Sequence, residues 1–138
     1  MAMAMRYTRV LREEQRRALE ARGQRVVAEV PSPEGDVYLF LETPDGFEWR
    51  GHTLRKADIV GARLLLNGAP MASAARAGVS LPEPASPPDF EGRERWDVRL
   101  HAGQGPVEVP CGTLREGVSR EAARAIFEAV RTALGSNG

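Results

Sequence analysis

The chain has 138 residues, of which 42% are hydrophobic and 28% charged, a composition that excludes a wholly disordered or fibrous protein. Its 19 basic and 19 acidic residues cancel, so no global charge draws it toward nucleic acid or an anionic membrane. No apolar run is long enough for a membrane span, and residues 1–5 lack the apolar core of a signal peptide. We therefore expect a cytoplasmic protein without membrane insertion.

Residues 1–23 are expected to form an N-terminal helix that is separate from the main domain. Between Arg6 and Arg22 apolar residues recur at helical spacing, and Gly23 follows where helices commonly end. Glu14 interrupts this narrow stripe, so we expect the helix to pack along an edge of the domain rather than through its core. The apolar positions are Tyr7, Val10, Leu11, Ala18 and Leu19.

The same segment carries the densest group of basic residues and is the candidate binding surface. Glutamates interleave with the arginines, and no exposed aromatic series suggests base stacking, so we expect no specific nucleic acid. A protein partner or a second copy of the chain is expected instead. We expect the helix to dock against the acidic turn that carries Glu42, Asp45 and Glu48, in its own chain or in another copy. The basic residues are Arg6, Arg9, Arg12, Arg16 and Arg17.

Three strands are predicted next, over Gln24–Val30, Val37–Thr43 and Phe47–Gly51. The middle one is apolar on both faces, which is typical of a central strand covered on both sides. A tight turn over residues 43–46 joins it to the third, with Pro44 fixing the first turn dihedral and Gly46 accepting a positive φ. We interpret the acids around this turn as solvated side chains rather than as a cation site or an acid–base pair.

Residues 56–77 can be interpreted in two ways. Lys56–Leu66 alternates like a strand, but an apolar run of this length also fits a buried helix. Residues 67–92 are rich in Pro, Ala and Gly and predict a surface excursion, with one short helical turn over Met71–Ala77. Pro84 and Pro87 have the spacing of a proline-rich ligand, which is common by chance in such loops.

The last third gives the clearest pattern. Residues 96–110 predict a hairpin with one buried and one solvent-exposed face. Trp96, Val98 and Leu100 are expected on the buried face. Asp97, Arg99 and His101 are expected on the exposed face. Ser119–Leu134 predicts an amphipathic helix that covers this sheet, and residues 135–138 predict a disordered tail. The apolar side of this predicted helix comprises Ala122, Ala123, Ile126, Phe127, Val130, Ala133 and Leu134.

Few residues offer chemistry. His52 and His101 are expected to be exposed at strand ends. The sequence contains no Cys-x-x-Cys or His-x-x-x-His motif, so we expect neither a metal nor a cofactor. The single cysteine, Cys111, excludes an internal disulfide and is expected to be a buried strand residue, because no base or helix start lies near it in the sequence. No catalytic residue is predicted.

Several segments together resemble the bacterial pleckstrin-homology-like domain. They are Asp45–Trp49, Ala57–Val60, the hairpin of Trp96–Pro110 and the helix Ala123–Leu134. The resemblance implies a bent antiparallel barrel closed at one end by the C-terminal helix, with Phe127 where that helix often carries a tryptophan. The family has seven strands and the sequence predicts six, so residues 67–92 must contain another strand if the resemblance holds. Lipid-binding members carry basic residues in the first strand loop, whereas residues 32–36 are acidic here, which argues against phosphoinositide binding.

The sequence therefore predicts an α+β domain over residues 24–134. Its antiparallel, bent sheet or small barrel has about six or seven strands, with an N-terminal helix and a capping C-terminal helix. We expect a non-catalytic binding or scaffolding module that contacts other proteins. If residues 56–77 are mostly helical, the element order instead resembles the type III secretion chaperone-like fold, whose members dimerise and hold partner segments. A small enzyme that uses Cys111 is the third alternative.

Overall fold

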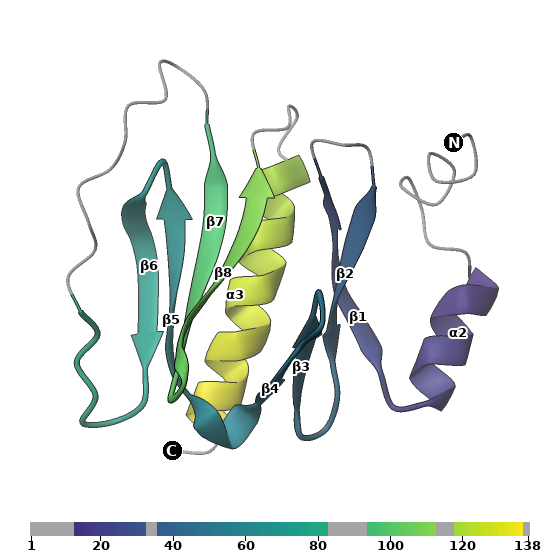
Figure 1. Ribbon diagram of the computed structural model, residues 1–138, viewed down its shortest axis with the longest axis horizontal. Coiled ribbons are helices and arrows are strands. Elements are labelled where there is room, and N and C mark those ends of the chain that lie inside the picture. Colours follow the sequence, from purple (N-terminus) through teal and green to yellow (C-terminus); the bar gives the residue numbers. More distant parts are fainter. Residues whose placement is uncertain (1–12, 33–35, 83–93, 113–117, 137–138) are drawn as a thin grey trace.

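The computed structural model describes residues 13–32, 36–82, 94–112 and 118–136 (Figure 1). The helices are α2 (Glu13–Ala21) and α3 (Val118–Ser136), and a 3-10 turn, η1, spans Lys56–Asp58. The strands are β1 (Arg25–Pro31), β2 (Val37–Glu42), β3 (Gly46–Trp49), β4 (His52–Arg55), β5 (Ile59–Leu66), β6 (Ala69–Ala75), β7 (Trp96–Ala102) and β8 (Gly105–Gly112).

The strands form two antiparallel sheets of four strands each (Figure 1). The first follows chain order, β1-β2-β3-β4, and the second has the order β6-β5-β7-β8. The predicted α+β class, the antiparallel pairing and the two helices are confirmed. The prediction of a single barrel of six or seven strands is wrong, because β4 and β6 were not recognised and the strands separate into two sheets.

Two tight hairpin turns explain the additional strands. Arg50 and Gly51, between β3 and β4, have φ values of 44° and 83°, and Asn67 and Gly68, between β5 and β6, have 51° and 81°. Two successive positive φ angles define the type I′ turn, whose twist matches that of the flanking strands. The chain therefore reverses direction at residues 50–51, where the predicted strand was expected to continue, and at residues 67–68, where a surface excursion was expected to begin.

The ambiguous segment over residues 56–77 is strand. After η1, β5 lies between β6 and β7 in the second sheet, and β6 occupies most of the range for which a short helical turn was predicted. The helical alternative, and with it the element order of the chaperone-like fold, is wrong for this chain. A further strand does lie within residues 67–92, as the resemblance required, whereas Pro84 and Pro87 fall outside the described residues.

The turn before β3 forms as expected, but the reason why it needs a glycine at position 46 differs from the predicted one. Thr43 N–H donates to the Gly46 carbonyl oxygen at 2.8 Å, and Gly46 N–H donates to Thr43 Oγ1 at 3.0 Å. Gly46 does not have a positive φ. A Cβ at this position would lie 2.3 Å from the Leu54 carbonyl oxygen, so the close approach of β4 requires the glycine.

The core lies between the sheets and α3. In the first sheet, Phe40 packs against Phe47 and Trp49, with ring centroids 5.6 and 6.1 Å apart. Phe40 is fully buried, but the other residues of β2 are half-buried, so the expected cover on both faces is incomplete. Helix α3 packs against β1 and against all four strands of the second sheet. Every apolar residue predicted for its inner side is buried, Phe127 at 3% exposure included.

Helix α2 lies at the far end of the first sheet (Figure 1). It contacts β1 and has no buried residue, which agrees with the expected edge packing. Residues 6–12 of the predicted helix lie outside the described residues. At the other terminus α3 continues through Ser136, so the tail predicted over 135–138 does not begin at residue 135. Neither described α-helix combines the length and apolar character that crossing a membrane requires.

Candidate functional site

A groove of about 590 Å³ lies between α3 and the second sheet. Buried Leu64 on β5, Trp96 on β7 and Phe127 on α3 supply its apolar lining. Residues with greater exposure complete the lining: Met71, Ala72, Arg124, Ala125 and Glu128. Such a mainly hydrophobic concavity with a few charged groups has the character of a binding site.

Met71 distinguishes this groove from the rest of the surface. Its side chain is 56% exposed, and in the described part of the chain Val118 is the only other large hydrophobic residue with comparable exposure. A methionine is unbranched and polarisable, so it adapts to different apolar partners. Met71 therefore offers an accessible apolar contact at the mouth of the groove.

Strand β6 forms an open edge beside the groove. Within the described residues it is the last strand of its sheet and pairs with β5 alone. Its sequence, APMASAA, contains no charged residue. Natural proteins usually protect such edges with charges or with covering elements, because unpaired backbone groups attract another strand. The groove and the unprotected edge thus adjoin each other.

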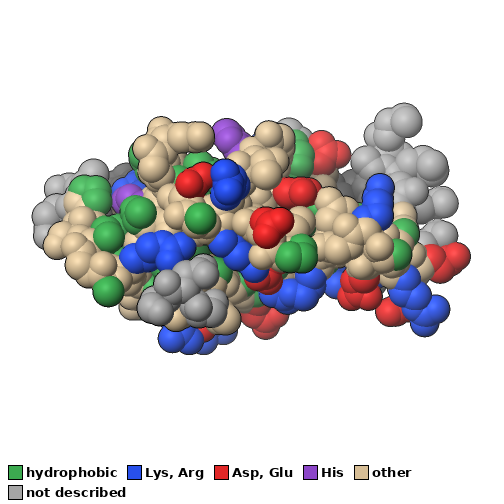
Figure 2. All heavy atoms as spheres, turned by 90° about the horizontal axis from the view of Figure 1, so that it is seen from below, with side chains coloured by type: hydrophobic (Ala, Val, Ile, Leu, Met, Phe, Trp, Pro, Cys, Tyr) green, Lys and Arg blue, Asp and Glu red, His purple; other side chains and the backbone are tan. Residues whose placement is uncertain are grey.

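Charges on the helix side of the groove are mixed. Arg124 and Glu128 lie one helical turn apart, and Glu128 also forms an ion pair with Arg131. Acidic and basic side chains are likewise interspersed over the face of the molecule seen in Figure 2. This arrangement agrees with the zero net charge, and it gives the groove no strong preference for a charged ligand.

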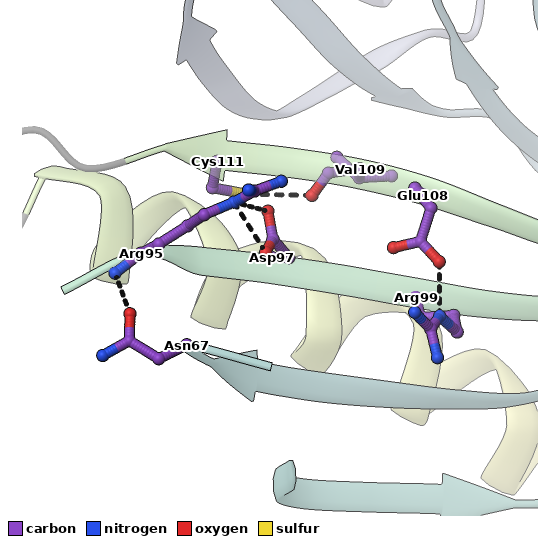
Figure 3. Close-up of polar contacts among 7 residues, drawn as sticks. All are labelled: Asn67, Arg95, Asp97, Arg99, Glu108, Val109 and Cys111. Atoms are coloured by element: carbon purple, nitrogen blue, oxygen red, sulfur yellow. Dashed lines mark hydrogen bonds and ion pairs between the residues drawn. The ribbon is translucent and has the colours of Figure 1, made fainter. Parts of the chain in front are cut away.

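The opposite face of the second sheet carries a band of polar residues (Figure 3). Asp97 forms an ion pair with Arg95 at 3.1 Å, and the Arg95 backbone N–H donates to Asn67 Oδ1 at 2.8 Å. Arg99 forms an ion pair with Glu108 on β8. These contacts hold the end of β5 and the strands β7 and β8 together on this face.

Two members of this band are more buried than the sequence indicates. Asp97 is 8% exposed and His101 is 9% exposed, so the prediction of solvent-exposed side chains is wrong for these two residues, whereas Arg99 is partly exposed as expected. Burial raises the pKa of Asp97, although Arg95 opposes the shift. Burial lowers the pKa of His101, and the positive charges of Arg63 and Arg99 lower it further. His52 is exposed, as predicted.

Cys111 is fully buried, as predicted. Burial and the nearby Asp97 carboxylate raise the pKa of its thiol to about 12, so the thiol is protonated near neutral pH. Its Sγ lies 3.6 Å from the Val109 carbonyl oxygen (Figure 3). A protonated, inaccessible thiol gives no support to a nucleophilic role.

Among the described residues of the predicted arginine surface, Arg16 and Arg17 show no ion pair with the acidic turn. Arg6, Arg9 and Arg12 lie outside the described residues, and Arg17 is exposed on α2. Arg16 contacts Glu29 on β1 at 3.4 Å rather than an acid of the turn.

The acids around the turn have partners from other segments. Glu42 forms ion pairs with Arg25 and Lys56, and Glu48 accepts a hydrogen bond from Gln24. Although burial acts in the opposite direction, the hydrogen bonds from Lys56 and Arg25 hold the pKa of Glu42 below its ordinary value. Asp45 is exposed. Glu42 therefore contributes to the ion pairs of the first sheet, and Glu48 contributes to its hydrogen bonds.

The described residues contain no group of three or more His, Cys, Asp or Glu side chains placed to hold a metal ion. No family model, curated protein or solved structure matches the chain.

Sequence reasoning missed the groove because residues 69–75 were not recognised as a strand. The available signal was the Asn67-Gly68 dipeptide between two apolar runs, which is typical of a type I′ hairpin. With this hairpin, Met71 falls on an edge strand instead of a loop.

Proposed function

We propose that the chain is a non-catalytic binding module that takes an extended segment of a partner protein along the edge of β6. The observation that carries the proposal is the uncharged edge of β6, to which no second strand pairs among the described residues, beside the groove that Met71 lines. Backbone hydrogen bonds to the edge would supply affinity, and an apolar side chain in the groove would supply specificity.

The proposal includes a pleckstrin-homology-like relationship and a cytoplasmic location. In favour of the relationship, a C-terminal helix covers the core with Phe127 on its buried face, and a strand lies within residues 67–92. Eight strands in two sheets, instead of one seven-stranded barrel, are the departure from that family.

Selection from a phage-displayed library of unstructured peptides tests the function. Peptides enriched on the full chain should perturb the backbone amide resonances of β6 and of the groove-lining part of α3. Met71→Glu should weaken their binding at least about tenfold, because a charge must then be desolvated, whereas Met71→Leu should retain it. Val118→Glu is the matched control, since it places the same charge on the other exposed hydrophobic residue.

Three results would contradict the proposal. The first is a selection that enriches no binder. The second is a set of binders with equal affinity for wild type and Met71→Glu. The third is a dimer in light scattering that Met71→Glu dissociates, because a second copy would then be the occupant of the edge.

A further inference from the structure

The outer face of the second sheet brings three basic side chains together from segments distant in the sequence. Arg63 on β5 pairs directly with Arg99 on β7, and His101 lies two residues further along β7, opposite Gly61. Like charges placed directly opposite each other destabilise a sheet unless something neutralises them. Glu108 neutralises Arg99, but Arg63 has no carboxylate partner among the described residues.

Two nitrogen atoms in this cluster are buried without a partner. They are Nε of Arg63 and Nε2 of His101, and His101 itself is 9% exposed. Buried polar atoms are nearly always hydrogen-bonded, so a pair of unpartnered nitrogens on neighbouring strands requires an explanation. Arg63 Nε is a permanent donor, and the imidazole Nε2 becomes a donor when it carries a proton.

The segment after β6 covers one side of the cluster. The Pro82 carbonyl oxygen accepts a hydrogen bond from Arg63 Nη1 at 2.7 Å, which fixes that guanidinium on the sheet. Leu81 packs on Gly61, the residue opposite His101, where an added Cβ would lie 2.5 Å from Leu81 Cδ2. This apolar cover lowers the local dielectric constant and strengthens attraction between the cluster and an anion.

We propose that Arg63, Arg99 and His101 form a binding site for an oxyanion of the phosphate type. Two guanidinium groups and one imidazole present more donors than a single carboxylate can accept, whereas a tetrahedral phosphate group has enough oxygen atoms for all three. A bound dianion would supply the counter-charge that Arg63 lacks among the described residues and would give both unpartnered nitrogens an acceptor. The site lies on the face of the sheet opposite the groove, so it stands independently of the peptide-binding proposal.

The two histidines of the chain make the test direct. Inorganic phosphate should shift the imidazole NMR resonances of His101 saturably, with a dissociation constant of about 1 mM or lower, and leave those of exposed His52 unchanged. Phenyl phosphate should act in the same way. Acetate at equal ionic strength should not, which separates a phosphate group from a carboxylate.

The protonation of His101 provides a second readout. Arg63, Arg99 and Glu108 are the charged groups that influence its imidazole, and burial together with the arginines lowers its pKa. A bound phosphate adds negative charge, so the pKa of His101 should rise in phosphate relative to chloride at the same ionic strength. The exposed His52 serves as the internal control.

Arg63→Gln should abolish the response of His101, and Arg55→Gln, a change at an exposed arginine on β4, should preserve it. The titration of wild type with phosphate tests the binding site even if Arg63→Gln does not fold. Absence of a saturable His101 shift in wild type would overturn the site. So would an undiminished shift in a folded Arg63→Gln variant, or equal responses of His101 and His52.

Discussion

The carbonyl oxygen of Leu54 lies 2.3 Å from the position that a Cβ on Gly46 would occupy. This approach is closer than any real Cβ contact, and the obstructing atom belongs to the backbone of β4. The β3–β4 hairpin must therefore shift if residue 46 carries a side chain.

Gly46→Ala should lower the free energy of unfolding by about 1–3 kcal/mol, as overpacking of a buried site does. Gly103→Ala is the matched control, because nothing lies within 4 Å of its added Cβ and its φ is not positive. Chemical denaturation of both variants checks the prediction. Equal stabilities would show that β4 moves aside without cost.

Phe127 anchors α3 to the sheets. Phe127→Ala should lower the free energy of unfolding by about 3–5 kcal/mol, because the side chain is 3% exposed and leaves a cavity in the core. Val118→Ala removes apolar atoms from an exposed position on the same helix and should change stability by less than about 0.5 kcal/mol. A melting temperature of Phe127→Ala close to that of wild type would mean that α3 does not dock as described.

Glu42 makes stability depend on pH. Its pKa is lowered in the folded state by Lys56 and Arg25, so its stabilisation is fully present above its unfolded pKa and is lost as pH falls through the folded pKa. Glu42→Gln should therefore be less stable than wild type at neutral pH, and the difference should shrink in acid. Denaturation curves across this pH range measure it. Asp45→Asn, at an exposed neighbour, is the matched control.

The N-terminal helix should be separable from the domain. Because α2 has no buried residue and contacts β1 at the edge of the fold, deletion of residues 1–22 should leave a cooperatively unfolding protein. Circular dichroism during thermal unfolding checks the fold. We further expect that the deletion weakens self-association in a salt-sensitive manner, which light scattering at two ionic strengths measures. An unfolded truncated chain would place the helix in the core, and an unchanged mass at both ionic strengths would remove its role in assembly.

The sequence predicted the elements whose signal is local. Helix α3 and the β7–β8 hairpin follow from periodicity within a single stretch of chain, and all seven inner residues of α3 are buried as expected. Strand β6 also has a local signal, because Asn67-Gly68 is typical of the type I′ turn that precedes it. Strand β4 had none, because Arg50 is an unusual residue for the positive φ that its turn requires.

The two candidate sites depend on contacts that local patterns do not contain. Arg63 and Arg99 become neighbours because β5 pairs directly with β7. In the sequence, β6 and the segment that follows it separate these two strands. His101 was expected to be exposed because it alternates with the buried residues of β7. The cover that Leu81 provides over Gly61 comes from a distant part of the chain, so alternation alone could not predict the burial of His101.

The position of α3 across both sheets has a consequence for how the protein is made. Strand β1 is the first of the described strands to be synthesised, yet α3, which packs on it, is synthesised after all of them. Each sheet can form its hairpins on the nascent chain, but their apolar faces stay uncovered until α3 emerges. Completion of this fold therefore waits for the synthesis of α3, and until then the nascent chain depends most on protection from aggregation.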